Sequence, residues 1–274
     1  MARRPEVIAH RGFSSERPEN TLSAVLHAIA AGVDGIEVDV RLTADGVPVC
    51  VHDRRTDRLA HERGVVSTMR LDELEALDFG AHRDDMADYE DPVVTTEVLT
   101  LAGLLEEATN APRPVRLAIE TKHPTRYGGY VEERLVEVLE DFGLARPEQP
   151  EKSMVRVMSF SLTAVRRVHR LAPALPTVLL MKELPWRLRR GALPGRVAAA
   201  GPSLTALRTN PHYVRRVHEA GGQVHVWTVD DPADIEWAVD LGVDALISNH
   251  PDRVLQVLAD RGFGGPPDGV DNAL

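Results

Sequence analysis

Short runs of β-branched and aliphatic residues alternate with longer helical patterns along almost the whole chain. Such alternation predicts a parallel sheet whose strands are connected by helical crossovers. The expected strands are Glu6–His10, Gly35–Arg41, Val115–Glu120, Met154–Ser159, Thr177–Met181, Ser203–Leu207, Gln223–Val229 and Ala245–Ser248, with Val197–Ala200 competing for the sixth place. Eight strands with mostly one helix between neighbours predict a (β/α)8 TIM barrel.

Helical patterns fill most of the intervals between these strands. They cover Thr21–Ala31, Leu101–Thr109, Tyr130–Phe142, Leu162–Leu171, His212–Ala220, Ala233–Leu241 and Arg253–Asp260. A doubly wound sheet would have a similar rhythm. No Gly-x-Gly-x-x-Gly motif follows the first strand, however, so the sequence favours the barrel.

One segment, Arg54–Glu97, breaks the rhythm, and its most polar stretch is His82–Asp91. It is expected to be an insertion packed over one end of the barrel, after the second strand and its hairpin. The total of 274 residues suits one barrel. We therefore predict a single domain over residues 1–264, with its insertion at 54–97 and a flexible tail at 265–274.

The charge balance restricts the partners of the chain. Acidic residues outnumber basic ones by 42 to 32, which gives a net charge of −10 and argues against a protein that binds nucleic acid by neutralising phosphates. No signal-peptide core follows the N-terminus, and no apolar run approaches the roughly 18 residues of a membrane span. With Cys50 as its only cysteine, the protein is expected to be cytoplasmic, with no stable membrane insertion.

Carboxylates occupy the interior face of two predicted strands. In Gly35–Arg41, residues Glu37 and Asp39 lie on the face opposite the aliphatic residues, and Glu120 repeats this pattern at the end of Val115–Glu120. Buried carboxylates need a cation or hydrogen-bond donors. An all-oxygen site suits Mg²⁺, Ca²⁺ or Mn²⁺, whereas a structural salt-bridge layer with Arg41 and Lys122 is the alternative.

Two histidines stand beside these carboxylates. His10 ends the first strand, and a two-residue hairpin at Asp45-Gly46 would place His52 opposite Asp39. Two histidines in such a place can supply the acid and the base for a displacement at phosphorus. The remaining histidines, including His225, are interpreted as ordinary polar residues.

Further residues suit an anionic substrate. Arg11 and Lys122 are close in sequence to His10 and Glu120, and either can bind phosphate oxygens or form an ion pair. Trp227 can pack on a substrate or fill the barrel. Asn20 or Thr21 would cap the first helix.

An ordered set of motifs resembles the glycerophosphodiester phosphodiesterase family. It comprises His10-Arg11-Gly12, Pro18-Glu19-Asn20-Thr21, Glu37-Val38-Asp39-Val40, Thr43-Ala44-Asp45-Gly46, Val51-His52-Asp53, Ile119-Glu120-Thr121-Lys122, Ser159-Phe160, Val226-Trp227-Thr228-Val229 and Ile247-Ser248-Asn249-His250-Pro251. The resemblance implies a TIM barrel with the family's insertion at Arg54–Glu97. It also implies one divalent cation on Glu37, Asp39 and Glu120, acid–base catalysis by His10 and His52, phosphate contacts from Arg11 and Lys122, and Trp227 near the substrate.

Two positions depart from the family pattern. Leu99-Thr100-Leu101 replaces a proline-threonine-leucine helix entry, and Asn249 stands where an aspartate is often found. Both are expected to lie outside the chemical core, where they would affect the insertion geometry and the choice of substrate.

The resemblance implies metal-dependent hydrolysis of a small glycerophosphodiester to glycerol 3-phosphate and an alcohol. The nucleophile, water or a substrate hydroxyl, stays open, as do the base histidine, the metal, the alcohol and the oligomeric state. A lysophospholipase D or sphingomyelinase D-like activity is one alternative. A catalytically silent phosphodiester-binding barrel is the other.

Overall fold

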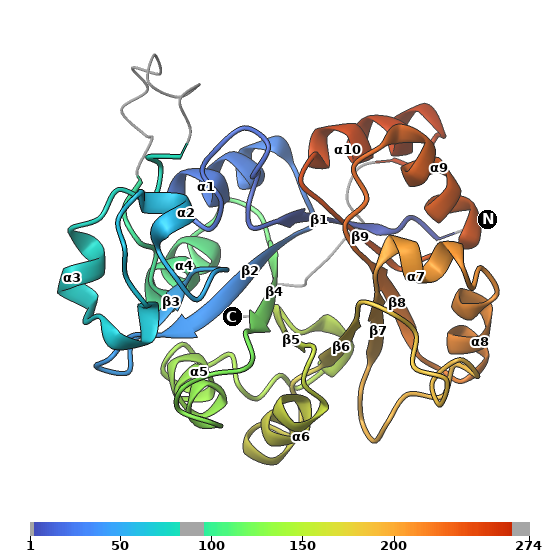
Figure 1. Cartoon of the computed structure of the whole chain (residues 1–274). Helices are drawn as coiled ribbons and strands as arrows, with labels where there is room; N and C mark the ends of the chain where they lie inside the picture. Colours follow the sequence, from blue (N-terminus) through green and yellow to red (C-terminus); the bar gives the residue numbers. More distant parts are fainter. Residues whose placement is uncertain (1–2, 83–95, 265–274) are drawn as a thin grey trace.

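The computed structural model describes residues 3–82 and 96–264, and its centre is a closed barrel of eight parallel strands (Figure 1). The strands are β1 (Glu6–His10), β2 (Gly35–Leu42), β4 (Arg116–Thr121), β5 (Val155–Ser159), β6 (Thr177–Met181), β7 (Ala199–Pro202), β8 (Gln223–Val226) and β9 (Ala245–Ser248). The barrel closes because β1 pairs with both β2 and β9. The predicted TIM barrel is confirmed.

Helices surround the barrel (Figure 1). They are α1 (Leu22–Ala31), α4 (Leu101–Thr109), α5 (Tyr130–Asp141), α6 (Leu162–Leu171), α7 (Leu204–Arg208), α8 (Tyr213–Glu219), α9 (Pro232–Leu241) and α10 (Pro251–Asp260), with a 3-10 turn, η3, at Pro150–Lys152. The aliphatic faces of the strands pack against these helices, and Ile36, Val38 and Val40 are fully buried in that layer. The alternation within β2 therefore turns Glu37 and Asp39 to the other side, as expected.

The sixth barrel strand lies earlier than predicted. The strand expected at Ser203–Leu207 is wrong, because β7 covers Ala199–Pro202 and pairs with β6. Ser203 is instead the N-cap of α7, and its hydroxyl accepts a hydrogen bond from the Ala206 amide. The competing run, Val197–Ala200, overlaps the observed strand.

The hairpin after β2 has a longer loop than predicted. The Thr43 amide donates to the Val47 carbonyl, which leaves three residues, Ala44–Gly46, in the loop. In the resulting register, Val40 of β2 lies opposite Cys50 of β3 (Pro48–Cys50), and the Val51 amide donates to the Asp39 carbonyl. The expected pairing of His52 with Asp39 is therefore wrong by one residue.

The segment after β3 has a small core of its own. It contains α2 (Asp57–Ala60), η1 (Val66–Thr68) and α3 (Leu71–Glu75). Buried Leu59, Val66 and Leu74 pack together with Val49 and Val51, so the segment is anchored on β3 and the residue that follows it. Apart from His82, the polar stretch predicted at His82–Asp91 lies outside the described residues, as does the predicted tail at 265–274.

None of the helices in the described parts of the chain is long and apolar enough to cross a membrane.

Candidate active site

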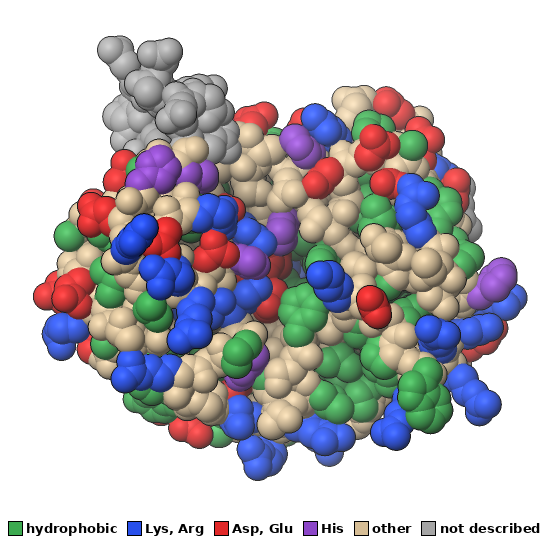
Figure 2. All heavy atoms as spheres, in the orientation of Figure 1, with side chains coloured by type: hydrophobic (Ala, Val, Ile, Leu, Met, Phe, Trp, Pro, Cys, Tyr) green, Lys and Arg blue, Asp and Glu red, His purple; other side chains and the backbone are tan. Residues whose placement is uncertain are grey.

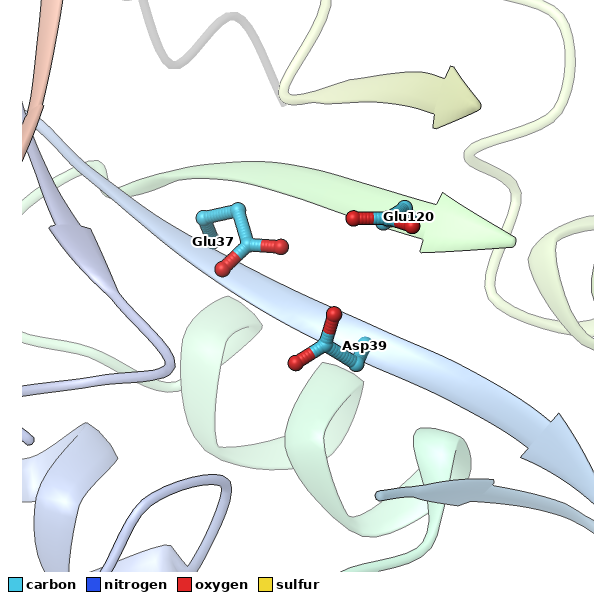
Figure 3. Close-up of side chains that lie close together, drawn as sticks. All are labelled: Glu37, Asp39 and Glu120. Carbon is cyan, nitrogen blue, oxygen red and sulfur yellow. The ribbon is translucent and has the colours of Figure 1, made fainter. Parts of the chain in front are cut away.

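Three buried carboxylates converge inside the barrel, near the carboxyl ends of its strands (Figure 3). Glu37 and Asp39 come from β2, and Glu120 comes from β4, where it lies beside Asp39 in the sheet register. Each carboxylate has an oxygen within 4.8 Å of the others, and none of the three residues is more than 7% exposed. The β2 alternation and the β2–β4 pairing thus bring the predicted ligands together.

The crowding of these carboxylates changes their acidity. Burial, followed by the charges of Asp39 and Glu120, raises the pKa of Glu37 well above its ordinary value. Burial and the Asp39 charge likewise raise the pKa of Glu120 to about 7. Burial also acts to raise the pKa of Asp39, but Lys122 and Arg11 outweigh it and hold that pKa below its usual range. An all-oxygen set with this excess of negative charge fits a hard divalent cation such as Mg²⁺, Ca²⁺ or Mn²⁺.

Two cationic side chains lie against the cluster. Lys122 Nζ is 3.1 Å from Asp39 Oδ1 and 2.9 Å from Glu120 Oε1. Arg11 Nε is 3.1 Å from Asp39 Oδ2, and its Nη1 is 2.9 Å from Glu19 Oε1. These contacts place both predicted phosphate-binding residues at the cluster and show that they also form ion pairs.

Arg41 does not join the salt-bridge layer that was the alternative interpretation. Its guanidinium donates to the backbone carbonyl of His52, with distances of 2.9 and 2.7 Å from Nε and Nη2. Lys122 is therefore the member of the predicted pair that contacts the carboxylates. Arg41 instead fixes the backbone that carries His52.

Asn20 contributes to the site in a way that the sequence did not reveal. Its Nδ2 donates to Asp39 Oδ2 at 3.0 Å, and the Asp39 amide donates back to its Oδ1 at 3.1 Å. Thr21 is the N-cap of α1. Both Arg11 and Asn20 have left-handed backbones, with φ of 59° and 58°, and both contact Asp39. Such backbone conformations in residues other than glycine are concentrated at functional sites.

His10 is oriented by a network that runs through Asn249. His10 Nδ1 lies 2.7 Å from Asn249 Oδ1, while the Asn249 backbone amide and Nδ2 donate to the two carboxylate oxygens of Asp230, each at 2.8 Å. Because Asp230 holds the amide nitrogen, the amide oxygen must face His10. His10 therefore carries a hydrogen on Nδ1 and turns Nε2 toward Glu37, 3.8 Å away.

The expectation that Asn249 lies outside the chemical core is wrong. Asn249 follows β9 and Asp230 follows β8 by a short loop, so both stand at the carboxyl ends of barrel strands. Barrel enzymes carry their functional groups at these ends. Their position after predicted strands could have indicated from the sequence that both residues are functional. The contact of Asn249 with His10, however, depends on the closure of β9 against β1.

His52 has a different partner. Its Nδ1 lies 2.8 Å from Asp53 Oδ1, and the other oxygen of Asp53 accepts from Arg58 Nε at 2.6 Å. His52 is thus supported by a carboxylate, whereas His10 is supported by a neutral amide. Burial, joined by the charges of neighbouring cations, lowers the pKa of both histidines.

A hollow connects these groups with an apolar wall. Its polar lining consists of His10, His52, Glu37, Glu120, Arg11 and Lys122, and its apolar lining includes Met158, Phe160, Leu180, Trp227 and Ile247. Trp227 Nε1 donates to the Gly201 carbonyl at 2.7 Å, and Phe160 packs edge-on against its ring at 5.4 Å between centroids. Trp227 therefore both fills the barrel and faces the hollow, which opens at the centre of Figure 2.

Comparison with known proteins identifies the chain. The profile of the glycerophosphoryl diester phosphodiesterase family matches residues 10–253, which include the whole carboxylate and histidine cluster. The chain belongs to this family. Within the family, a Mycobacterium tuberculosis protein named probable glycerophosphodiester phosphodiesterase 1 is 44% identical over 265 residues, covering 97% of this chain and 96% of that protein.

Two further proteins resemble the chain over most of its length. A Bacillus subtilis glycerophosphodiester phosphodiesterase is 31% identical over 250 residues, which cover 89% of this chain and 83% of that protein. A solved structure of an Oleispira antarctica phosphodiesterase, in complex with the product sn-glycerol 3-phosphate, aligns with a TM-score of 0.78 and 25% identity. That alignment covers 93% of this chain and 97% of the other.

Proposed function

We propose that the protein hydrolyses glycerophosphodiesters to glycerol 3-phosphate and an alcohol. The observation that carries this proposal is the convergence of three buried carboxylates and two histidines beside one hollow. Membership of the glycerophosphoryl diester phosphodiesterase family supports it, as does the product bound to the Oleispira antarctica relative.

Glu37, Asp39 and Glu120 would hold one divalent cation. When bound, this cation binds a phosphoryl oxygen and stabilises the charge that develops there. Arg11 and Lys122 donate to the remaining phosphate oxygens. Both side chains already contact Asp39, so both are held in position before the substrate binds.

The two histidines would divide the proton transfers. His10 presents the lone pair of Nε2 to the site and suits the base, which takes the proton from the attacking hydroxyl. His52 suits the acid, because the Asp53 carboxylate orients its ring through Nδ1 and acts to raise its pKa, against the lowering by burial, Arg11 and Lys122. The ester bond between phosphorus and the leaving oxygen breaks, and His52 protonates that oxygen. Water is consumed overall, and the products are glycerol 3-phosphate and the free alcohol.

A turnover screen tests this proposal. Glycerophosphodiesters are supplied with Mg²⁺, Ca²⁺ and Mn²⁺ separately, and release of glycerol 3-phosphate is measured. His10→Ala and His52→Ala should each abolish release, whereas His218→Ala is the matched control. His218 is also bonded to a carboxylate, Asp244 at 2.7 Å, but it lies outside the hollow. Full activity in either active-site variant, or in excess chelator, would refute the mechanism.

One observation keeps a lysophospholipid substrate as the second candidate. That alternative requires an exposed apolar rim, and Phe160, which lines the hollow, is 45% exposed. Lysolipids therefore belong in the same screen. Turnover of a lysolipid at a higher kcat/KM than any glycerophosphodiester would assign the protein to that activity.

A further inference from the structure

A second cleft adjoins the hollow on the side of the segment after β3. It lies between η1 and the loop that follows β4, and its lining includes Arg41, Arg54, Lys122, Arg126 and Tyr127. Lys122 lines both spaces, so the cleft adjoins the hollow at a side chain predicted to bind phosphate. In Figure 2, blue side chains gather along the left of the central hollow.

The charge of this cleft is one-sided. Four of its lining residues are cationic, and no described acidic residue lines it. Arg54 and Arg126 are exposed, and neither has a carboxylate of the described chain within ion-pair distance. Arg41 is already committed to the His52 carbonyl, so these two guanidiniums are the ones that remain for a ligand.

The walls of the cleft are joined to each other. Tyr127 Oη donates to the Ser67 carbonyl at 2.8 Å, which connects the loop after β4 to η1. The Tyr127 amide in turn donates to Thr125 Oγ1 at 3.2 Å. The guanidinium of Arg126 lies 5.8 Å from the centroid of the Tyr127 ring. The loop that carries Arg126 is therefore hydrogen-bonded to η1 across the cleft.

A phosphodiester has two ester arms, and the site has two directions in which to place them. One leads to the apolar wall of Phe160 and Trp227, and the other leads to the cationic cleft. Glycerol is uncharged, so a negative group that the cleft attracts must belong to the alcohol arm.

The cleft itself, at about 20 Å³, has room for little more than a water molecule, so a larger group can only lie across its mouth, beside the exposed Arg54 and Arg126. We propose that these two arginines form a subsite for an anionic alcohol, and that the preferred substrates are glycerophosphodiesters whose alcohol carries a phosphate or carboxylate group. The preference in turnover rests on the proposed function, whereas the preference in binding does not. Coulomb attraction at about 4 Å in water corresponds to about a fivefold gain for each free arginine. A quaternary ammonium alcohol such as choline would be repelled by the same charges.

The test compares kcat/KM for glycerophosphoglycerol phosphate, glycerophosphoglycerol and glycerophosphocholine. The expected order is anionic, neutral, cationic. In the Arg54→Gln/Arg126→Gln protein, the ratio of the anionic to the cationic substrate should fall by about tenfold or more. The ratio should also shrink at 1 M salt, where the Debye length falls to about 3 Å. Because a ratio is measured, partial misfolding of the variant does not affect it.

Arg215→Gln is the matched control, since Arg215 is an exposed arginine on α8 that lies outside both spaces. It should leave the ratio unchanged. Equal or better use of the choline ester, or a ratio that the double variant does not alter, would overturn the subsite. Calorimetric binding of the three diesters to the His10→Ala protein separates the two proposals. An anionic preference there, without turnover by the wild type, would refute the proposed function and keep the subsite.

Discussion

The two ends of the barrel each bury a charged cluster, and the two clusters are built differently. At the amino ends of the strands, Arg116 Nη1 lies 2.6 Å from one carboxylate oxygen of Glu6, and Arg156 Nη2 lies 2.7 Å from the other. At the carboxyl ends, Lys122 is shared by Asp39 and Glu120, and the Arg11 side chain is shared by Asp39 and Glu19. Glu37 instead accepts from the Arg11 backbone amide, at 3.1 Å.

The difference appears in the acidity of the carboxyl groups. Burial acts to raise the pKa of Glu6, but Arg156 and Arg116 outweigh it and lower that pKa. In the other cluster, burial and neighbouring carboxylates raise the pKa of Glu37 and Glu120. Removing a carboxylate that is paired with buried guanidiniums destabilises the fold, whereas crowded carboxylates retain the capacity to bind a cation. The comparison therefore separates a cluster whose carboxylate is paired within the fold from one whose carboxylates could hold a cation.

The largest effect is expected from Glu37→Gln. Glutamine is similar in size to a protonated glutamate side chain, but it cannot supply an anionic ligand. Activity should therefore fall by about a thousandfold or more. The melting temperature in chelator should change little, because the pKa of Glu37 is already raised well above its ordinary value. Divalent cations should raise the melting temperature of the wild type and not that of the variant. Activity that survives the substitution would remove Glu37 from the cation site.

Glu6→Gln should have the opposite outcome. It leaves two largely buried guanidiniums without a carboxylate, which should cost about 3 kcal/mol of unfolding free energy. The kcat per folded molecule should not change, because Glu6 lies at the other end of the barrel. Urea unfolding and steady-state kinetics measure the two quantities. Glu219→Gln is the control, since the contact of Glu219 with Arg215 is exposed. A loss of kcat without a loss of stability would contradict the assignment.

Asn249→Ala tests whether His10 depends on its support. Loss of the amide oxygen frees the His10 ring, so kcat should fall by about 10- to 100-fold, with a smaller change in KM. Nitrogen-15 shifts of the imidazole should show the Nδ1-protonated form in the wild type and a mixture in the variant. Ser14→Ala, which removes another donor to Asn249 Oδ1 at 3.0 Å, should cost less. An unchanged tautomer would show that Asn249 does not set it.

The smallest effect concerns pH and the amino end of the barrel. Burial, together with Arg156, lowers the pKa of His225 to about 3. The unfolded chain binds this proton near pH 6.5 and the folded chain does not, so stability falls as the pH drops from 6.5. Between pH 6.5 and 5, the loss from this group is at most about 2 kcal/mol. His225→Gln should flatten the decline of the urea midpoint over that range, and an equally steep decline would exclude His225 as its source.

Much of the site could be predicted because it depends on local alternation. The strands Glu6–His10, Thr177–Met181 and Ala245–Ser248 begin and end where the sequence predicted, since β-branched runs are bounded there by polar residues or turns. Glu37 and Asp39 face the barrel interior because side chains alternate along a strand. The strand at Ser203–Leu207 failed because a serine hydroxyl that caps a helix competes with a strand assignment.

The sequence by itself determined the barrel, the three carboxylates, the two histidines and the cationic residues beside them, because periodicity and residue type are local properties. Tertiary structure alone decided which groups support them. Asn249 reaches His10 only because β9 closes against β1, and the three-residue loop before β3 shifts the His52 register. The cationic cleft likewise exists only where η1 meets the loop after β4. Contacts between distant segments depend on how the chain closes, and no local pattern encodes that closure.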